Sequence, residues 1–194
     1  MAKILSQNYS YANNSSGDLI KISTAQRNEK YFCPICGELM NPHMGKVRRW
    51  HFVHKNAGNC SYESYLHKVA KIKIREVFLS SEHFLLSYNA KAICSLECPF
   101  IGFPKCEGEK PVEFDLRRYY DTCEIEATYH QYRADLLLTS TTNPKTPPML
   151  IEIMVTHKCT EDKIKDGVRI IEIPIQSEEQ IDNIVSDCKL TAVR

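Results

Sequence analysis

The most constraining feature of the sequence is a pair of cysteines, Cys33 and Cys36, separated by two residues. Two cysteines at this spacing can bind one metal ion, because a tight turn directs both sulfurs to the same point. Pro34 and Gly37 are residues that favour such a turn. A metal bound here needs two further ligands from nearby segments, which restricts how the N-terminal part of the chain can fold.

The segment His51-Phe-Val-His54 and Cys60 supply candidates for those two ligands. Cys33, Cys36, Cys60 and one histidine form a Cys3His set of the kind that binds zinc tetrahedrally. His51 and His54 lie on opposite faces of the strand expected here, so only one of them ligates. His54 is favoured because it lies nearer to Cys60.

The alternative for these residues is that they are buried free thiols and a surface histidine. If zinc is bound, all four ligand positions are filled by the protein. Such a closed site contributes to folding energy and not to chemistry.

Composition supports metal binding over disulfides. The chain has 194 residues and nine cysteines, and its N-terminus lacks the layout of a secretory signal. Its 43% hydrophobic content suffices for a buried core, and no apolar run approaches the roughly 20 residues of a membrane-spanning helix. We therefore expect a soluble, cytoplasmic protein without membrane contact, with one ordinary domain and a small satellite.

The net charge of +1 conceals an uneven distribution of charge. Residues 46–75 contain eight lysines and arginines against Glu63 alone, whereas residues 107–126 contain seven acidic residues. Basic regions of this kind are suited to polyanionic partners.

Hydrophobic periodicity predicts the order of elements. Residues 1–60 should hold a strand at 19–24 and a small metal-pinned hairpin, and residues 61–194 a second domain of α/β (α+β) class with a Cys-rich insertion at about 90–110. In the second domain we expect a helix capped by Ser61 and an antiparallel meander of four strands, with a turn-rich segment at 139–148. A short helix, a buried strand and a terminal helix should follow. The predicted ranges are 61–79 (helix), 112–120, 122–129, 132–138 and 149–156 (meander), 160–165 (helix), 168–175 (strand) and 177–188 (helix).

Two acidic residues, Asp135 and Glu152, lie on adjacent predicted strands. If these strands pair symmetrically about their loop, position 138 faces 149 and Asp135 faces Glu152. Like charges so placed repel unless a cation lies between them, and magnesium needs only one or two protein carboxylates. The pair is therefore a candidate site for a divalent metal ion.

The predicted helix offers a further acid to this site. Glu63, His67 and Lys71 recur every four residues and form one polar stripe. Alternatively, the stripe is a solvated helix face, and Asp135 and Glu152 are solubilising charges on edge strands. Spacing alone leaves both interpretations open.

Several segments together resemble the competence protein CoiA-like family, in which an N-terminal zinc-finger-like module precedes a PD-(D/E)XK nuclease domain. The resemblance implies a restriction-endonuclease-like PD-(D/E)XK core in residues 61–194, with a mixed sheet flanked by helices, after a small zinc-binding β-hairpin module. The matching segments, which lie within residues 19–175, are YFCPICGELM, RRWHFVHKNAGNC, ESYLHKVAKIKI, YRADLLL and LIEIMVTHK.

The resemblance also assigns roles to the acidic residues. Asp135 and Glu152 would bind the catalytic Mg or Mn, and Glu63 would be the helix-borne acid that completes the site. The implied activity is hydrolysis of DNA phosphodiester bonds by a metal-bound water. The basic stretch would hold the nucleic-acid backbone, and Trp50, Phe52 or Tyr65 would stack on a base or pack in the core.

One position departs from the family pattern. The superfamily usually has a lysine two residues after the second acid, where this chain has Met154. Methionine can neither orient a water nor stabilise charge on a phosphate. Three residues are candidate replacements for this lysine. Lys158 is included in the predicted catalytic set, and Lys163 is a second candidate. Arg133 is the third, because it would face Met154 in the proposed register.

Met154 keeps a second function open. The chain is either an active metal-dependent nuclease or a zinc-stabilised nucleic-acid-binding or adaptor protein whose nuclease-like site has lost its chemistry. A third possibility, an unrelated α/β interaction protein, holds if Asp135 and Glu152 do not converge.

A second group of cysteines follows the predicted helix. Cys94, Cys98 and Cys106 lie in a stretch with Pro and Gly, and Cys123 follows in the next hairpin. Four thiolates can bind a second zinc ion, but the spacing is looser than in the first group. Small hydrophobic cysteines without metal are the alternative.

Overall fold

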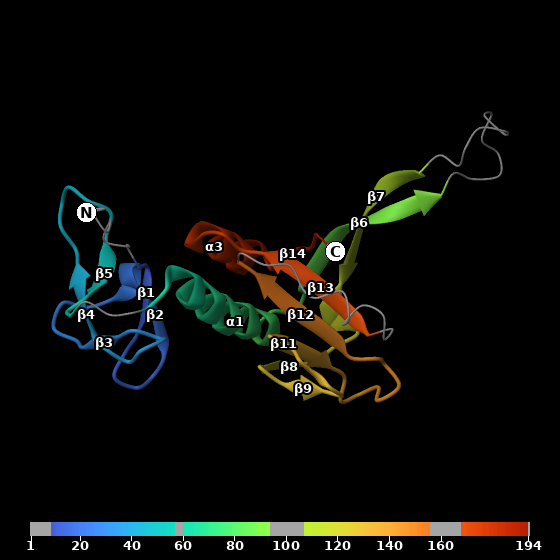
Figure 1. Ribbon diagram of the computed structural model, residues 1–194, viewed down its shortest axis with the longest axis horizontal. Helices are drawn as coiled ribbons and strands as arrows, with labels where there is room; N and C mark the ends of the chain where they lie inside the picture. Colours follow the sequence, from blue (N-terminus) through green and yellow to red (C-terminus); the bar gives the residue numbers. More distant parts are fainter. Residues whose placement is uncertain (1–8, 57–59, 94–106, 156–167, 194) are drawn as a thin grey trace.

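The computed structural model describes residues 9–56, 60–93, 107–155 and 168–193. In these residues the chain has mixed α+β architecture, with an N-terminal module at one end of the molecule and a larger domain at the other (Figure 1). The predicted fold class is confirmed in this general form.

The N-terminal module is a five-stranded antiparallel sheet, and so it is larger than the hairpin expected from the sequence. Its strand order is β2-β1-β3-β4-β5. The predicted strand 19–24 is shorter than expected, because it turns after Lys21 into the 3-10 helix η1 (Ile22–Thr24). The strands are β1 (Tyr11–Asn13), β2 (Leu19–Lys21), β3 (Tyr31–Phe32), β4 (Leu39–His43) and β5 (His51–His54).

Helix α1 (Tyr62–Ser80) joins the module to the larger domain. It begins where the hydroxyl of Ser61 accepts a hydrogen bond from the backbone N–H of Ser64 at 3.0 Å, as predicted for a capping serine. One face of the helix is buried against β8, β12 and α3. The buried apolar residues recur at helical spacing and are Tyr65, Leu66, Val69, Ala70, Ile74, Val77 and Phe78.

The main sheet of the larger domain has the strand order β13-β12-β11-β8. Strand β11 is antiparallel to β8 and β12, and β13 is parallel to β12, so the sheet is mixed. Pairing of Leu136 with Ile151 and of Leu138 with Met149 confirms the predicted register of β11 and β12. The strands are β8 (Thr122–Ile125), β11 (Leu136–Thr139), β12 (Met149–Met154) and β13 (Arg169–Pro174).

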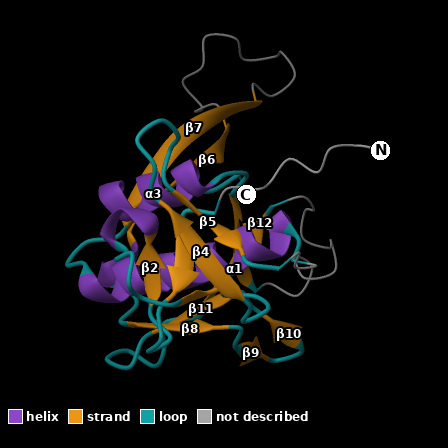
Figure 2. Ribbon diagram, turned by 90° about the vertical axis from the view of Figure 1, so that its left-hand side faces the viewer, coloured by secondary structure: helices purple, strands orange, loops and turns teal. Residues whose placement is uncertain are grey.

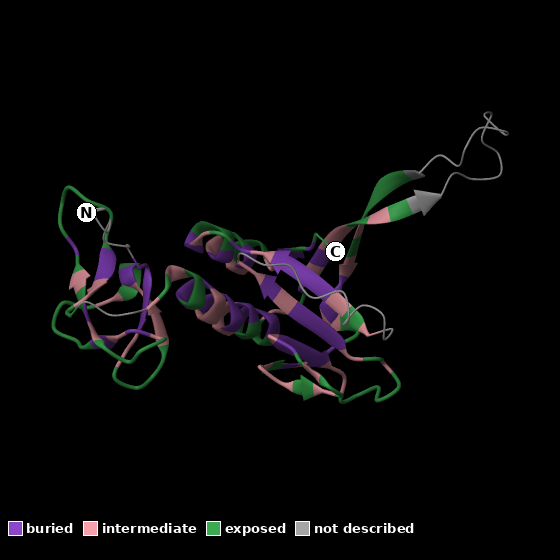
Figure 3. Ribbon diagram, in the orientation of Figure 1, coloured by how far each residue is buried: buried purple, intermediate pink, exposed green. Residues whose placement is uncertain are grey.

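A separate three-stranded sheet corrects the predicted meander. Strand β7 (Glu107–Asp115), followed by the 3-10 helix η2 (Leu116–Arg118), pairs with β6 (Leu85–Ile93) and not with β8. Strand β6 was not predicted, and its end overlaps the expected Cys-rich insertion at about 90–110. It also pairs in parallel with β14 (Lys189–Thr191). This hairpin extends away from the core and is largely exposed towards its far end, so its sequence lacks an alternating apolar pattern (Figure 3).

The segment predicted to be a short helix, 160–165, lies outside the described residues. The predicted terminal helix is α3 (Glu178–Asp187), capped by Ser177. Seen from the side of the N-terminal module, the strands of the module lie in front of α1 and α3 (Figure 2).

A buried carboxylate fastens the N-terminal module to both helices. Glu178, at the start of α3, is 6% exposed. One of its oxygens accepts hydrogen bonds from the backbone N–H of Ser10 at 2.6 Å and the hydroxyl of Tyr65 at 2.5 Å, and the other accepts from the hydroxyl of Ser10 at 2.6 Å. Burial and the Glu178 charge raise the pKa of Tyr65, which therefore remains a hydrogen-bond donor.

Replacing this carboxylate tests its role. Glu178→Ala leaves the N–H of Ser10 and the hydroxyl of Tyr65 buried without their acceptor, so we expect a loss of about 2–4 kcal/mol in the free energy of unfolding. Glu179→Ala, at the exposed neighbouring position, should cost less than about 0.5 kcal/mol. Urea unfolding of both variants measures the difference, and equal losses would contradict the prediction.

Candidate metal centre and acidic site

The predicted zinc ligands converge in the structure. The ligand atoms of Cys33, Cys36, His54 and Cys60 all lie within 4.8 Å of one another. The sulfurs of Cys33 and Cys60 are 3.8 Å apart, and the sulfur of Cys36 lies 3.5 Å from Nε2 of His54. Tetrahedral zinc, with bonds of about 2.3 Å to sulfur and about 2.0 Å to nitrogen, requires edges of about 3.8 and 3.5 Å. These four residues can therefore bind a zinc ion.

Backbone geometry explains the Cys-x2-Cys motif. Gly37 has φ 72°, a left-handed conformation that glycine adopts without strain. The N–H of Gly37 donates to the carbonyl of Cys33 at 3.0 Å, and the N–H of Ile35 donates to the sulfur of Cys33 at 3.4 Å. This turn holds both sulfurs on the same side of the chain.

The structure distinguishes the two candidate histidines. His54 faces the thiols, while His51 is 8% exposed and its Nδ1 lies 2.8 Å from the carbonyl of Arg49. The preference for His54 agrees with this arrangement.

Tyr9 connects the thiol cluster to helix α1. Its ring contacts the rings of His54, at a centroid distance of 5.3 Å, and Tyr65, at 4.7 Å. Burial and the neighbouring thiols raise the pKa of Tyr9. The metal centre is thus in direct contact with the side chains that dock the module on α1.

Metal analysis tests this centre. We expect Cys36→Ser and His54→Ala to lose zinc and to unfold at a lower temperature, because the bound metal stabilises the folded state. His51→Ala should keep its zinc and is the matched control. Loss of zinc from His51→Ala, with retention by His54→Ala, would reverse the assignment. A zinc-to-protein ratio near two in the wild type would support a second site.

Four acidic residues follow one another across the main sheet. The N–H of Glu126 donates to the carbonyl of Asp135 at 2.9 Å, which sets these residues opposite each other. Asp135 lies in a bend one step before the Leu136–Ile151 pair, at the position next to Glu152. Glu152 in turn pairs with Glu172 of β13. We call these four residues the acidic row.

Two side chains of α1, Lys71 and His67, reach this acidic row. Lys71 is 4% exposed, and its ammonium nitrogen lies 2.7 Å from Oε1 of Glu126 and 3.6 Å from Oδ1 of Asp135. Nε2 of His67 lies 2.8 Å from Oδ2 of Asp135, which also accepts the N–H of Ile153 at 2.9 Å. Like charges on adjacent strands need a cation between them, and between Glu126 and Asp135 this cation is Lys71.

These contacts change the acidity of both carboxyl groups. Burial opposes ionisation of Asp135, but the hydrogen bonds from His67 and the Ile153 N–H, with the charge of Lys71, outweigh it and lower the pKa of Asp135. The hydrogen bond and charge of Lys71 lower the pKa of Glu126. Both side chains are therefore stabilised as carboxylates.

The other predicted site residues lie elsewhere. Glu63 is exposed on the first turn of α1, one turn before His67. Arg133 does not follow the expected pairing with Met154: it lies in β10 (Tyr132–Arg133), pairs with Thr128 of β9 (Thr128–Tyr129), and its guanidinium binds Glu126. Lys158 and Lys163 lie outside the described residues.

The second cysteine group is largely outside the described residues, which include only Cys123 of its four members. Cys123 is 3% exposed in the hydrophobic core, and burial raises its pKa to about 12. The second zinc site with Cys94, Cys98 and Cys106 stays a prediction.

Two features of the site were missed from the sequence. Glu126 was not recognised as the partner of Asp135, although the short His130–Gln131 connection between β9 and β10 fixes their pairing. Lys71 was placed only on a polar stripe, although it is the buried cation of the site. Of the three aromatic residues proposed to stack or pack, Phe52 and Tyr65 are buried and Trp50 is exposed.

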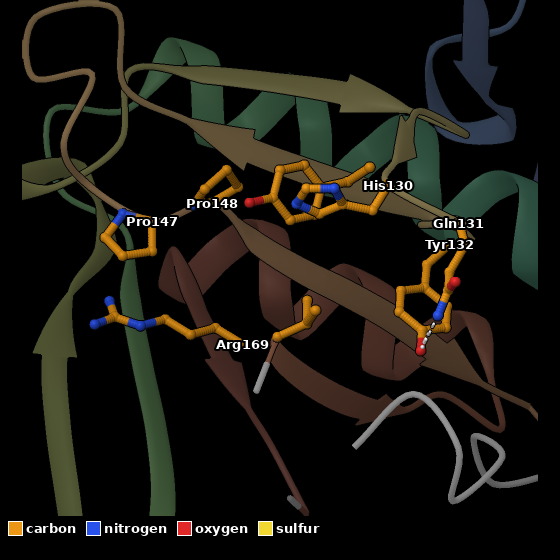
Figure 4. A pocket seen from close by; sticks show the side chains of 8 residues that line it. His130, Gln131, Tyr132, Pro147, Pro148 and Arg169 are labelled. Atoms are coloured by element: carbon orange, nitrogen blue, oxygen red, sulfur yellow. Dashed lines mark hydrogen bonds between the residues drawn. The ribbon is translucent and has the colours of Figure 1, made fainter. Parts of the chain in front are cut away.

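A hollow of about 620 Å³ lies beside the β9–β10 hairpin, away from the acidic row. Figure 4 shows His130, Pro147, Pro148 and Arg169 around it, with the amide of Gln131 donating to the hydroxyl of Tyr132 at 2.9 Å. Glu63, Asp135 and Glu152, the predicted catalytic residues that the structure describes, do not line this hollow. Within the described residues, the thiol cluster is the group of three or more potential ligands that converges on one point.

Substitution of Lys71 tests its role in the acidic row. Lys71→Met leaves Glu126 and Asp135 facing each other without their cation, so we expect a loss of about 3 kcal/mol in the free energy of unfolding at neutral pH. Glu126→Gln in the Lys71→Met background should restore part of this loss.

The effect of Lys71→Met should depend on pH. Because the folded protein lowers the pKa of both carboxyl groups, their pairing stabilises it above the unfolded values of about 4, and this stability is lost as the pH falls through the lowered values. The difference from wild type should therefore narrow in acid. A difference that is constant with pH would contradict the pairing.

These features define a protein whose N-terminal module carries a candidate metal site and is followed by a mixed α+β domain. Residues 16–63 match the family model described as competence protein CoiA, N-terminal domain. The match includes all four thiol and imidazole ligands and ends at the start of α1. The resemblance of the sequence to the CoiA-like family is thus confirmed for this N-terminal segment.

Comparison with curated proteins and with solved structures found no match. Among the helices that the structure describes, none has the combination of length and apolar character needed to cross a bilayer.

Proposed function

We propose that this protein is a CoiA-like, metal-dependent nuclease that hydrolyses phosphodiester bonds of DNA in the cytoplasm. The core of the active domain would be of the PD-(D/E)XK kind, formed by α1, the antiparallel strands β8, β11 and β12, and the parallel strand β13. The observation that carries the proposal is the convergence of His67 and Lys71 from α1 on Asp135, next to the position of Glu152.

Asp135 and Glu152 would hold a Mg or Mn ion, since such an ion needs only one or two protein carboxylates. Bound there, the metal would polarise the phosphate and provide a nucleophilic water. The charged state of Asp135 suits a hard cation, and the N–H of Ile153 and the ring of His67 orient its carboxylate. Glu63, exposed one turn along α1, would complete the acidic set.

Lys71 would compensate for the lysine that Met154 replaces. The ammonium nitrogen of Lys71 lies 3.6 Å from Oδ1 of Asp135, closer than that of any other lysine in the described residues. Because it is buried, Lys71 acts as a positioning residue: it holds Asp135 and Glu126 in place and adds positive potential at the site. Glu126 in turn holds Lys71.

A second candidate function is nucleic-acid binding or an adaptor role without hydrolysis. It is favoured by the saturation of Asp135, whose oxygens already contact His67, Lys71 and the N–H of Ile153. Met154, at the end of β12, also supplies no positive charge where the nuclease superfamily usually has a lysine.

Incubation of the zinc-loaded protein with plasmid DNA and Mg tests the two functions. We expect the wild type to cleave, and Asp135→Asn and Glu152→Gln each to reduce the rate by about 100-fold or more, because each removes a metal ligand. Glu124→Gln, exposed on the same sheet, should cleave like the wild type. Cleavage that survives both substitutions would refute the site, and activity that appears only in Met154→Lys would support the second function.

A further inference from the structure

The loop Gly45–Trp50, which joins β4 to β5, is an exposed structure with an apolar tip. All six of its residues are exposed. Val47 is 97% exposed and Trp50 is 43% exposed. Val47 and Trp50 are the apolar side chains that this loop presents to solvent.

Hydrogen bonds fix the shape of this loop. The indole N–H of Trp50 donates to the carbonyl of Gly45 at 2.9 Å and closes the loop across its base. The guanidinium of Arg27 donates to the carbonyl of Met44 at 2.7 Å, and Nδ1 of His51 lies 2.8 Å from the carbonyl of Arg49. These hydrogen bonds restrict the conformation of the loop, so less conformational entropy is lost when it binds a partner.

The charge of the loop is strongly positive. Lys46, Arg48 and Arg49 flank Val47, and the sequence contains no aspartate or glutamate from residue 39 to residue 62. Beside the loop is a hollow of about 420 Å³ lined by His43, Gly45, Lys46, Val47, Arg48 and His51. Cations around a hollow provide a site for an extended anion.

We propose that this loop binds duplex DNA, with Lys46, Arg48 and Arg49 on backbone phosphates and Val47 against base edges in a groove. Arginine matches phosphate oxygens bidentately, and proteins that contact the minor groove often combine such cations with an apolar side chain at the tip. The proposal takes its partner class from the proposed function. Its observations are independent of the acidic row, because the loop belongs to the N-terminal module (Figure 1).

The matched substitutions Val47→Glu and Val193→Glu test the loop. Both place a carboxylate at an exposed valine, since Val193 is 57% exposed near the end of the described chain. In the zinc-loaded full chain with Asp135→Asn, binding of a short fluorescein-labelled duplex is measured by anisotropy. We expect Val47→Glu to weaken binding by roughly tenfold or more, because it repels phosphates, and Val193→Glu to leave it nearly unchanged. Equal binding by both variants would overturn the proposal.

The salt dependence of binding gives a second test. Replacing Lys46, Arg48 and Arg49 with alanine should lower the slope of the logarithm of the binding constant against the logarithm of salt concentration by about 2–3, as three lost phosphate contacts require. Replacing the exposed Lys91, Lys110 and Lys145 removes the same charge and should not change the slope. Zinc content and unfolding temperature should be the same in all variants.

The remaining outcomes separate the two proposals. Loop-dependent DNA binding without cleavage by the wild type supports the loop and refutes the nuclease. Cleavage and binding that survive the loop substitutions support the nuclease and refute the loop. Competition by polyglutamate as effective as that by unlabelled duplex would also refute the loop as a DNA site and would indicate an acidic protein partner.

Discussion

The buried ammonium group of Lys71 constrains the packing of the whole larger domain. A charge at this depth is costly unless it is paired, and its partners, Glu126 and Asp135, lie opposite each other directly after β8 and directly before β11. Helix α1 can therefore pack on the sheet in only one rotation about its axis. In that rotation His67, on the same side of the helix as Lys71, contacts Asp135. Tyr65, nearer the N-terminal end of the helix, contacts Glu178. One ion-pair network thus aligns α1 with the acidic site and with the module.

The thiol cluster constrains the position of the N-terminal end of α1. Cys60 lies directly before the cap of α1, while Cys33 and Cys36 belong to the turn between β3 and β4. A metal bound by these residues ties the start of the helix to the N-terminal sheet, and Tyr9 fills the space between His54 and Tyr65. The centre is structural in its chemistry, yet it helps to determine where the helix that carries His67 and Lys71 begins.

The features that could be predicted from the sequence depend on short-range rules. Cys33, Cys36, His54 and Cys60 were found because metal geometry demands close spacing. The register of β11 and β12 was found because two strands joined by one loop were expected to pair symmetrically about it. The capped helix followed from the spacing of its apolar residues. The hairpin of β6 and β7 was missed because its outer part packs against no core and so leaves no apolar alternation. The burial of Lys71 was not predicted, because no local pattern distinguishes a buried, paired lysine from a solvated one. The roles assigned to Asp135 and Glu152 stay predictions.

The contact between Ser10 and Glu178 joins parts of the chain that are 168 positions apart. Such a contact forms late in folding, because nearly the whole polypeptide must first be brought together. During synthesis on the ribosome, the N-terminal strands and their thiols emerge long before α3 exists. All four candidate zinc ligands are therefore synthesised before Glu178, and the attachment of the module to α3 must wait until translation has passed Glu178.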